Sequence, residues 1–204
     1  QAADAVINFD NLDLSLIEIS HRSKNVVAVM DEAVALVKEL LNVPDGYSVI
    51  FLQGGASLEF CMIPYNFMRV GGSAAYLETG TWAKNARKES ELFGTTTVVA
   101  SSEDQNFSYI PKDYVIPNDA DYFHCTSNNT IFGTQMKQFP KSPVPVICDM
   151  SSDIFSRTIN VEDFAMIYAG AQKNLGPAGA TVVIVKDELL GKTGRQIPTM
   201  LDYS

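Results

Sequence analysis

Lys173 lies in a segment of small residues and glycines, Tyr168–Gly179, where a flat ligand can approach the backbone closely. A lysine amine attacks an aldehyde only when it is neutral, so a lysine that forms a Schiff base needs a partly desolvated setting. Apolar neighbours on both sides are expected to supply that setting: Ala169, Ala171, Leu175 and Pro177. Most lysines that follow a strand are simply exposed, so Lys173 alone does not decide the chemistry.

Asp149 is the second candidate. It directly follows the apolar run Val144–Cys148, where a buried parallel strand would reach its carboxyl end, the edge at which open α/β sheets bind ligands. A further strand at Phe164–Tyr168 would return Lys173 to the same edge. Pyridoxal phosphate requires a lysine for its aldehyde and a carboxylate that keeps its ring nitrogen protonated. An aspartate at a strand end is more often a helix cap, but its pairing with Lys173 favours the cofactor.

The segments that must position these residues alternate between helix and strand patterns. Asn25–Leu41 carries its apolar residues on one side and predicts an amphipathic helix, and Tyr47–Leu52 predicts a buried strand. Further strands are predicted at residues 74–77, 96–100, 122–125, 144–148, 165–168 and 181–185, with helical segments between several of them. This alternation is typical of an α/β fold with a doubly wound sheet.

A glycine pair, Gly54 and Gly55, separates the strand at 47–52 from a helix that is predicted to begin near Ala56 or Ser57. A helix start after glycines presents backbone amides and the positive end of the helix dipole, and Ser57 adds a hydroxyl donor. The pattern is consistent with a phosphate site. It is equally consistent with a plain tight turn.

Taken together, several motifs resemble those of the class V aminotransferases, which are fold-type I enzymes that use pyridoxal phosphate. The matching segments follow in order: Ile19–Arg22, Phe51–Phe60, Gly80–Trp82, Ser127–Thr130, Cys148–Ser152, Tyr168–Gly179 and Leu201–Ser204. The resemblance covers nearly the whole chain. It rests on the order and spacing of these segments, since each one alone is weak evidence.

The resemblance implies a three-layer α/β/α fold with a mostly parallel central sheet. It identifies residues 1–204 as the large domain that binds pyridoxal phosphate, apparently without the N-terminal segment and the small C-terminal domain of the family. It also implies a homodimer in which residues of both subunits build each site.

Site residues follow from the same resemblance. Ala56, Ser57 and Gln172 occupy positions that bind the cofactor phosphate, although some relatives carry an arginine in place of Ser57. Trp82 corresponds to the aromatic residue that stacks on the pyridine ring, and Thr130 to a threonine near that ring. On its own, a single tryptophan is more often a core side chain.

His21 and Arg22 follow an apolar, strand-like stretch, Leu14–Ile19. The family pattern places this arginine at the substrate carboxylate, which a guanidinium can bind through two hydrogen bonds. His21 would bind a substrate phosphate or only orient Arg22. Without the resemblance, both residues would be read as surface or helix-capping residues.

The implied activity is ping-pong transamination between glutamate and 3-phosphohydroxypyruvate, which gives phosphoserine and 2-oxoglutarate, a step of serine biosynthesis. Lys173 would act as base and acid in turn. Two alternatives stay open. One is another class V enzyme, such as an alanine–glyoxylate-type aminotransferase or a cysteine desulfurase. The other is a truncated, non-catalytic fragment that binds the cofactor or forms dimers.

Composition argues against several other classes of protein. The net charge of −9 disfavours nucleic-acid binding. Three scattered cysteines and two histidines do not suggest disulfides or a zinc site, and no metal is expected. We expect a cytoplasmic protein, because there is no signal-peptide pattern and no apolar run of membrane-spanning length. Dinucleotide-binding, P-loop and serine-hydrolase motifs are also missing from the sequence.

Overall fold

The computed structural model describes residues 2–204, and the chain divides into two units, residues 1–40 and residues 41–204. The first unit contains α1 (Ala2–Ile7), a short 3-10 helix (Phe9–Asn11) and most of α2 (Lys24–Leu41). The amphipathic helix predicted at residues 25–41 is thus confirmed as α2. Ser23 precedes it and its Oγ accepts a hydrogen bond from the Val26 amide at 3.4 Å.

The strand-like reading of residues 14–19 is wrong, because the structure forms turns there. The Glu18 amide donates to the Ser15 carbonyl at 2.9 Å, and the Glu18 carboxylate accepts from the Ser15 amide at 2.9 Å. These local hydrogen bonds between serine, glutamate and the backbone compete with an extended chain. Apolar content alone therefore predicts a strand where the chain forms turns.

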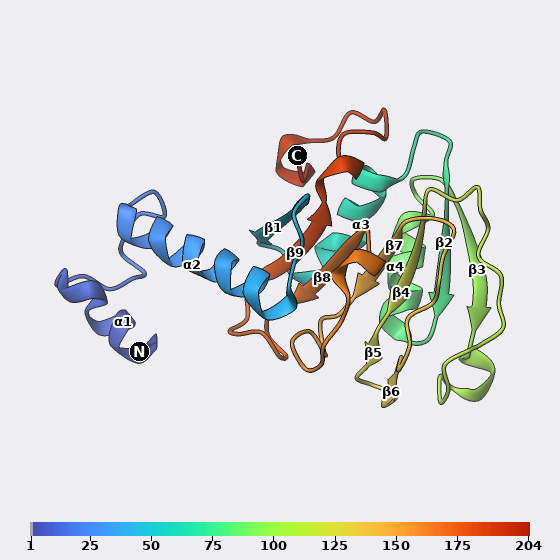
Figure 1. Ribbon diagram of the computed structural model, residues 1–204, viewed down its shortest axis with the longest axis horizontal. Helices are drawn as coiled ribbons and strands as arrows, with labels where there is room; N and C mark the ends of the chain where they lie inside the picture. The colour runs from blue at the N-terminus through green and yellow to red at the C-terminus, as the bar shows by residue number, and fades with distance from the viewer. Residues whose placement is uncertain (1) are drawn as a thin grey trace. The chain divides into compact units, whose positions relative to one another are not determined.

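The second unit is built on a seven-stranded sheet with the order β1-β9-β8-β7-β4-β2-β3 (Figure 1). The strands are β1 (Tyr47–Leu52), β2 (Ser73–Glu78), β3 (Thr95–Ser101), β4 (Tyr122–Thr126), β7 (Val146–Asp149), β8 (Met166–Gly170) and β9 (Thr181–Lys186). A separate two-stranded ribbon joins β5 (Asn128–Asn129) to β6 (Thr134–Gln135). Short 3-10 helices cover Glu103–Gln105, Val161–Asp163, Asp187–Leu189 and Thr199–Leu201.

The sheet is mostly parallel. β9 pairs antiparallel with both of its neighbours, β1 and β8, whereas the pairs from β8 through β7, β4 and β2 to β3 are all parallel. Every strand except β9 therefore ends at one edge of the sheet. This confirms the predicted fold class of a mostly parallel central sheet with flanking helices.

The predicted strands are confirmed with ends shifted by one or two residues, and the shift at β7 has a clear cause. This strand begins at Val146 rather than at Val144, after Pro143 and Pro145, which have no amide hydrogen to donate to a ladder. It also includes Asp149 as its last residue. The carboxylate is thus fixed by the sheet itself rather than by the loop after it.

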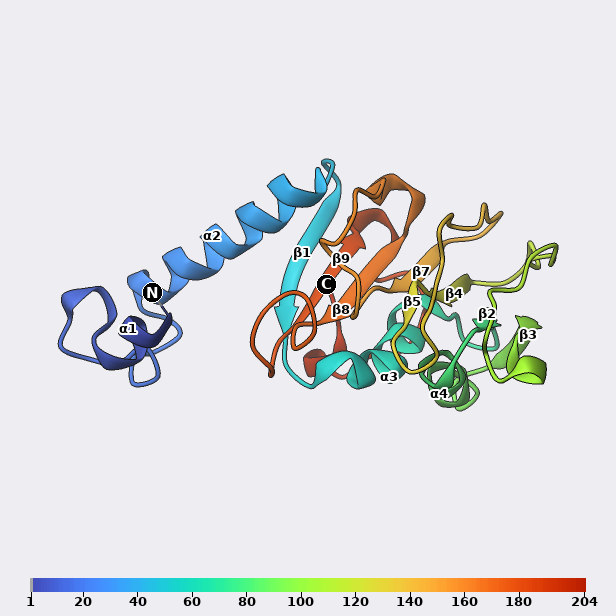
Figure 2. The same ribbon diagram turned by 90° about the horizontal axis from the view of Figure 1, so that it is seen from below.

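Two helices cover one face of the sheet: α3 (Gly55–Phe67) and α4 (Thr81–Ser90) (Figure 2). Side chains of both helices pack on the strands in one hydrophobic cluster, whose members include Phe60, Met62, Ile63, Phe67, Met68, Tyr76, Ala86, Tyr122, Ile147, Met166, Tyr168, Val183 and Tyr203. Burial of this apolar area is the main favourable contribution to folding here. It holds the helix starts in place beside the strand ends.

Polar groups inside this core are hydrogen-bonded to one another. The hydroxyls of Tyr76 and Tyr122 lie 2.8 Å apart, and Ser90 Oγ lies 3.0 Å from the Tyr122 hydroxyl. His124 Nε2 lies 2.9 Å from the Tyr168 hydroxyl, and burial lowers the pKa of His124 to about 3. His124 is therefore a neutral core residue at physiological pH.

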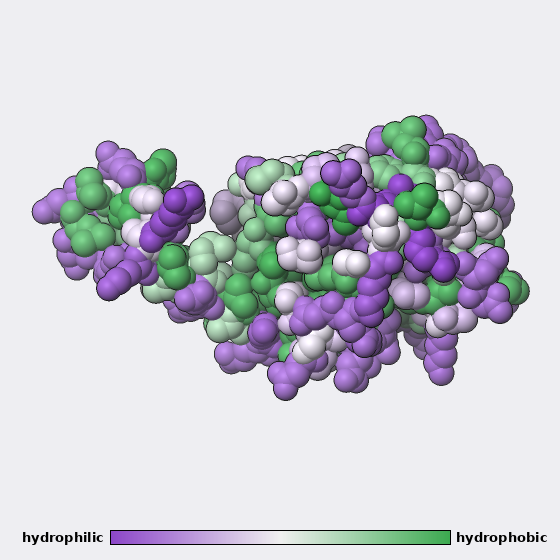
Figure 3. Space-filling view, turned by 90° about the horizontal axis from the view of Figure 1, so that it is seen from above, coloured by the Kyte–Doolittle hydropathy of each residue, from purple (hydrophilic) through white to green (hydrophobic). Residues whose placement is uncertain are grey.

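The surface of the molecule mixes polar and apolar side chains, as the face shown in Figure 3 illustrates. Among residues 2–204, no helix is long and apolar enough to cross a membrane. The same part of the chain holds no group of three or more His, Cys, Asp or Glu residues placed to bind a metal ion.

Glu59 is a buried carboxyl group in α3. Its side chain is inaccessible to solvent, and its Oε2 accepts a hydrogen bond from the hydroxyl of Tyr203 in the C-terminal segment. Its other oxygen, Oε1, has no hydrogen-bond partner within residues 2–204. Burial raises the pKa of Glu59 to about 7, and the bond from Tyr203 only partly opposes this rise.

We predict that the substitution Glu59→Gln changes how stability depends on pH. The unfolded chain releases the Glu59 proton near pH 4.5 and the folded chain near pH 7, so the wild type loses stability as pH rises between these values. The neutral glutamine lacks this loss. Relative to wild type, the variant should gain about 3 kcal/mol from pH 4.5 to pH 7, measured by urea unfolding at a series of pH values.

Glu89→Gln on the exposed side of α4 is the matched control, and it should stay within about 0.5 kcal/mol of wild type throughout. Parallel curves for wild type and Glu59→Gln would contradict a raised pKa at Glu59.

Candidate functional site

The predicted site residues of the second unit gather at the edge where the parallel strands end. The segment after β1 leads through Gly54 into α3, and the segment after β2 leads through Gly80 into α4. Thr130 follows β5, the short strand after β4, Asp149 ends β7, and Lys173 follows β8. Parallel pairing of β4, β7 and β8 brings these segments side by side, as expected for a ligand site in an open α/β sheet.

Asp149 is held in place on the sheet. It pairs in register with Thr126 of β4 and Tyr168 of β8, and only 6% of its surface is exposed. Its Oδ1 accepts two hydrogen bonds from Ser151, from the amide at 2.9 Å and from Oγ at 2.6 Å. Burial raises the pKa of Asp149, while the bonds from Ser151 and the charge of Lys173 oppose the rise. The site thus holds a carboxylate at the edge of an apolar core.

Lys173 lies in the turn after β8, and its Nζ donates a hydrogen bond to Thr130 Oγ1 at 3.3 Å. The turn is closed by the Ala171 amide, which donates to the Ala180 carbonyl at 2.9 Å, and by Asn174 Nδ2, which donates to the Ile154 carbonyl at 2.6 Å. Lys173 is therefore hydrogen-bonded to Thr130 and close enough to Asp149 for the two charges to interact.

The expected desolvation of Lys173 is not observed. The side chain is exposed, since Ala169 and Ala171 face the core, Leu175 is half-buried and Pro177 is exposed. The apolar neighbours in sequence do not cover the Lys173 amine. Those before Lys173 are buried in the core, and those after it lie in an open turn.

The predicted phosphate positions meet at Gly170. A Cβ atom built on this glycine would lie 2.8 Å from Gln172 Oε1 and 3.5 Å from the Ala56 Cβ. Gln172 and the first turn of α3 thus approach the bare backbone at the end of β8. The α3 helix begins at Gly55, and Gly54 before it takes a left-handed φ of 97° and offers no side-chain cap, which leaves the first amides for another acceptor.

Trp82 is the second residue of α4 and is 39% exposed. Together with Ser57 of α3, it lines a cavity of about 310 Å³ between the two helices. The side chain therefore presents an aromatic surface to solvent near the predicted phosphate positions. It is not the fully buried core side chain that a lone tryptophan would otherwise suggest.

His21 and Arg22 belong to the first unit, and both are exposed. The backbone amide of Arg22 donates a hydrogen bond to Ser20 Oγ at 3.3 Å in a local turn. This bond says nothing about a ligand for the side chains of His21 and Arg22. Their predicted substrate role stays a prediction.

Two residues of the site escaped the sequence reading. Ser151 binds Asp149, and Asn129 joins the segments after β2 and β4: its Oδ1 accepts from Thr79 Oγ1 at 3.3 Å, and its Nδ2 donates to Thr134 Oγ1 at 3.1 Å. A serine two residues after an aspartate is a known signal for a side-chain-capped turn, so Ser151 was detectable. The contacts of Asn129 depend on tertiary structure and carry no such signal.

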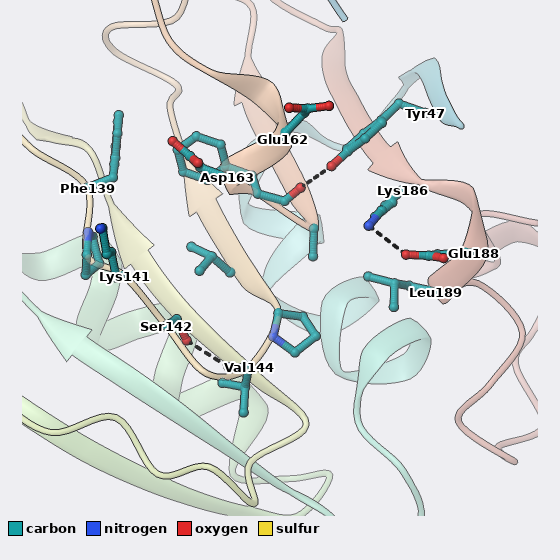
Figure 4. Close-up of a pocket in the computed structure, with 15 residues that line it drawn as sticks. Tyr47, Phe139, Lys141, Ser142, Val144, Glu162, Asp163, Lys186, Glu188 and Leu189 are labelled. Atoms are coloured by element: carbon teal, nitrogen blue, oxygen red, sulfur yellow. Dashed lines mark hydrogen bonds and ion pairs between the residues drawn. The ribbon is translucent and has the colours of Figure 1, made fainter. Parts of the chain in front are cut away.

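A larger cavity of about 600 Å³ lies at the opposite edge of the sheet (Figure 4). Its lining includes Tyr47 at the start of β1, Val146 at the start of β7 and Lys186 at the end of the antiparallel β9. The Tyr47 hydroxyl donates to the Phe164 carbonyl at 2.8 Å, and Lys186 pairs with Glu188 at 2.6 Å. None of the predicted site residues lines this cavity.

We predict that Gly80→Ala destabilises the chain by about 1–3 kcal/mol. Gly80 has a φ of 170°, which any residue can adopt, so the effect is purely steric. The added Cβ would lie 2.7 Å from Asn129 Oδ1, and Asn129 is held by two hydrogen bonds and nearly buried. Urea unfolding measures the loss.

Gly176→Ala in the turn of Lys173 is the matched control, since an added Cβ there meets nothing within 4 Å. It should be neutral or slightly stabilising. Equal stability of the two variants would mean that the contact between Gly80 and Asn129 is not tight.

Comparisons with known proteins agree with this geometry. The family model described as aminotransferase class V matches residues 10–199. The chain is 64% identical over 204 residues to phosphoserine aminotransferase of Flavobacterium psychrophilum, covering 100% of this chain and 57% of that protein. It is 54% identical over 205 residues to phosphoserine aminotransferase of Geobacillus kaustophilus, again covering 100% of this chain and 57% of that protein.

Solved structures give the same relation. Phosphoserine aminotransferase from Bacillus circulans subsp. alkalophilus superposes with a TM-score of 0.94 at 47% identity, over 99% of this chain and 57% of that one. The pyridoxal-phosphate-bound enzyme from Trichomonas vaginalis superposes with a TM-score of 0.92 at 38% identity, over 99% of this chain and 58% of that one. The chain therefore spans a little over half the length of these relatives. It belongs to the class V aminotransferase family.

Proposed function

We propose that the chain is part of a phosphoserine aminotransferase, which binds pyridoxal phosphate and transfers an amino group from glutamate to 3-phosphohydroxypyruvate in serine biosynthesis. The observation that carries the proposal is the meeting of Asp149, Lys173 and Thr130 at the ends of parallel strands. Relatives that share 54–64% of its residues bear that name.

The residues at this edge fit the cofactor. Asp149 is a buried carboxylate whose hydrogen bonds from Ser151 both end on Oδ1, which leaves Oδ2 for a ring nitrogen. Uncapped amides at the start of α3 and the amide of Gln172 suit a phosphate. Lys173 provides an amine near both groups. When bound, pyridoxal phosphate supplies an aldehyde carbon and a ring that withdraws electrons from the α-carbon of an amino acid.

Four side chains of this chain would then hold the cofactor ring and move the proton. Asp149 accepts a hydrogen bond from the protonated ring nitrogen and keeps that proton in place. Lys173 Nζ would take the proton from the α-carbon of the amino donor and pass it to the carbon that carried the cofactor's aldehyde, and in the second half-reaction it would move a proton in the opposite direction. Thr130 Oγ1 accepts a hydrogen bond from Nζ and limits where the amine can go. Trp82 offers a flat face that orients the ring.

Substrate recognition is assigned to Arg22 and His21. A guanidinium grips a carboxylate through two parallel hydrogen bonds, so Arg22 would bind the α-carboxylate, with His21 at the substrate phosphate or beside Arg22. We also propose a cytoplasmic homodimer, as the family resemblance implies, in which both subunits contribute to each site.

Lys173→Ala should abolish covalent attachment of the cofactor. Wild-type chain incubated with pyridoxal phosphate and reduced with borohydride should carry the label on the peptide that contains Lys173, as mapped by mass spectrometry. The variant should carry none there. Because Lys173 is exposed, its loss should change the free energy of unfolding by no more than about 0.5 kcal/mol.

Lys137→Ala is the matched control, since Lys137 is also exposed and donates one hydrogen bond, to Gln135 Oε1 at 2.7 Å. It should keep the label. Unchanged turnover of amino donor by Lys173→Ala would refute the assignment of Lys173.

Substrate class is tested by comparing phosphoserine with serine as the amino donor. A site that reads the phosphate should consume phosphoserine at least about a hundredfold faster at equal low concentration, since two or more charge-assisted hydrogen bonds are at stake. Loss of the absorption band of the bound cofactor in a single half-reaction measures both rates. Equal rates would favour another class V activity, such as an alanine–glyoxylate-type aminotransferase or a cysteine desulfurase.

A further inference from the structure

Ser151 makes three hydrogen bonds at the centre of the site. Its amide and its Oγ both donate to Asp149 Oδ1, at 2.9 Å and 2.6 Å. Its Oγ also accepts from the Gly170 amide at 3.1 Å. Ser151 is 7% exposed, so none of these bonds competes strongly with water.

These bonds connect two strand ends that carry different parts of the site. Asp149 ends β7, and Gly170 ends β8, directly before the turn that holds Gln172 and Lys173. The Gly170 amide has no ladder partner on the Ser151 side, so the serine oxygen replaces a backbone acceptor there. A single hydroxyl group thus fixes both the carboxylate and the start of the lysine turn.

We propose that Ser151 is a positioning residue for Asp149: it holds the carboxylate in one rotamer, stabilises its ionised form and turns Oδ2 toward the position of the cofactor's ring nitrogen. The role toward the ring rests on the function proposed above. The bonds themselves are properties of this chain alone.

The need for such a residue follows from the surroundings of Asp149. Burial disfavours the ionised carboxylate, and so does the nearby carboxylate of Asp153. Tyr168 and Cys148 also lie close but are neutral at physiological pH, because burial raises the pKa of each. The positive charge of Lys173 favours the ionised form of Asp149, but the Lys173 side chain is exposed. The two bonds from Ser151 are the larger opposing influence.

A structural role for Ser151 would be different in kind. If the serine only satisfied the Gly170 amide, its removal would weaken the junction of β7 and β8 but leave the ionisation of Asp149 unchanged. The titration of Asp149 therefore separates the two roles.

The test follows the Asp149 carboxyl carbon by NMR in chain labelled with [13Cγ]aspartate, without added cofactor, and uses Asp149→Asn to identify its resonance. In Ser151→Ala, the titration midpoint of Asp149 should rise by about one pH unit or more relative to wild type. Ser151→Thr keeps a hydroxyl donor and should restore most of the wild-type midpoint.

Ser152→Ala is the matched control. Ser152 is the next residue in the chain, and its hydroxyl bonds Asn128 rather than Asp149. A shift in Ser151→Ala no larger than that in Ser152→Ala, or no recovery in a folded Ser151→Thr, would overturn the proposal. Because no cofactor is present, this outcome is distinct from a failure of the proposed function, which would show instead as no label on Lys173.

Discussion

The parallel pairing of β4, β7 and β8 is the constraint on which the site depends. It brings the ends of three separate segments to one edge and places Asp149 in register with Thr126 and Tyr168. A side chain fixed by two neighbouring strands loses little further freedom when it binds a ligand. The segments after these strands extend only a few residues before Lys173 donates to Thr130 and its charge acts on Asp149.

This arrangement places the carboxylate of Asp149 at the margin of an apolar core, where burial disfavours its ionised form. Burial favours the neutral acid at Asp149, as it does at Glu59 in α3. The two residues differ in their donors: Glu59 has the hydroxyl of Tyr203 and one oxygen without a partner, whereas Asp149 has an amide and a hydroxyl on the same oxygen and a lysine nearby. Local hydrogen bonding therefore decides which buried carboxyl group suits ionic chemistry.

Much of this could be predicted from the sequence, because it rests on local pattern. The strand before Asp149, the strand before Lys173 and the glycine pair before α3 were each evident from apolar runs and glycines, and the shared edge followed from parallel topology. The pairing of Asp149 with Lys173 predicts the cofactor from the sequence alone. The substrate roles predicted for His21 and Arg22 rest on family resemblance alone.

The failures of prediction share a physical cause. Residues 14–19 look like a strand by apolar content, but Ser15 and Glu18 satisfy the backbone locally and form turns. Lys173 has apolar neighbours in sequence, yet the open turn after β8 exposes its amine. Asn129 supports the segment before Trp82 only because Thr79 lies across from it in space. In each case the local structure is decided by a hydrogen bond or by the direction of the backbone. Hydrophobic periodicity reports neither of these. The chemistry of a site such as this one is therefore set by the polar residues that brace it, and these are the residues that a hydrophobic pattern reports least.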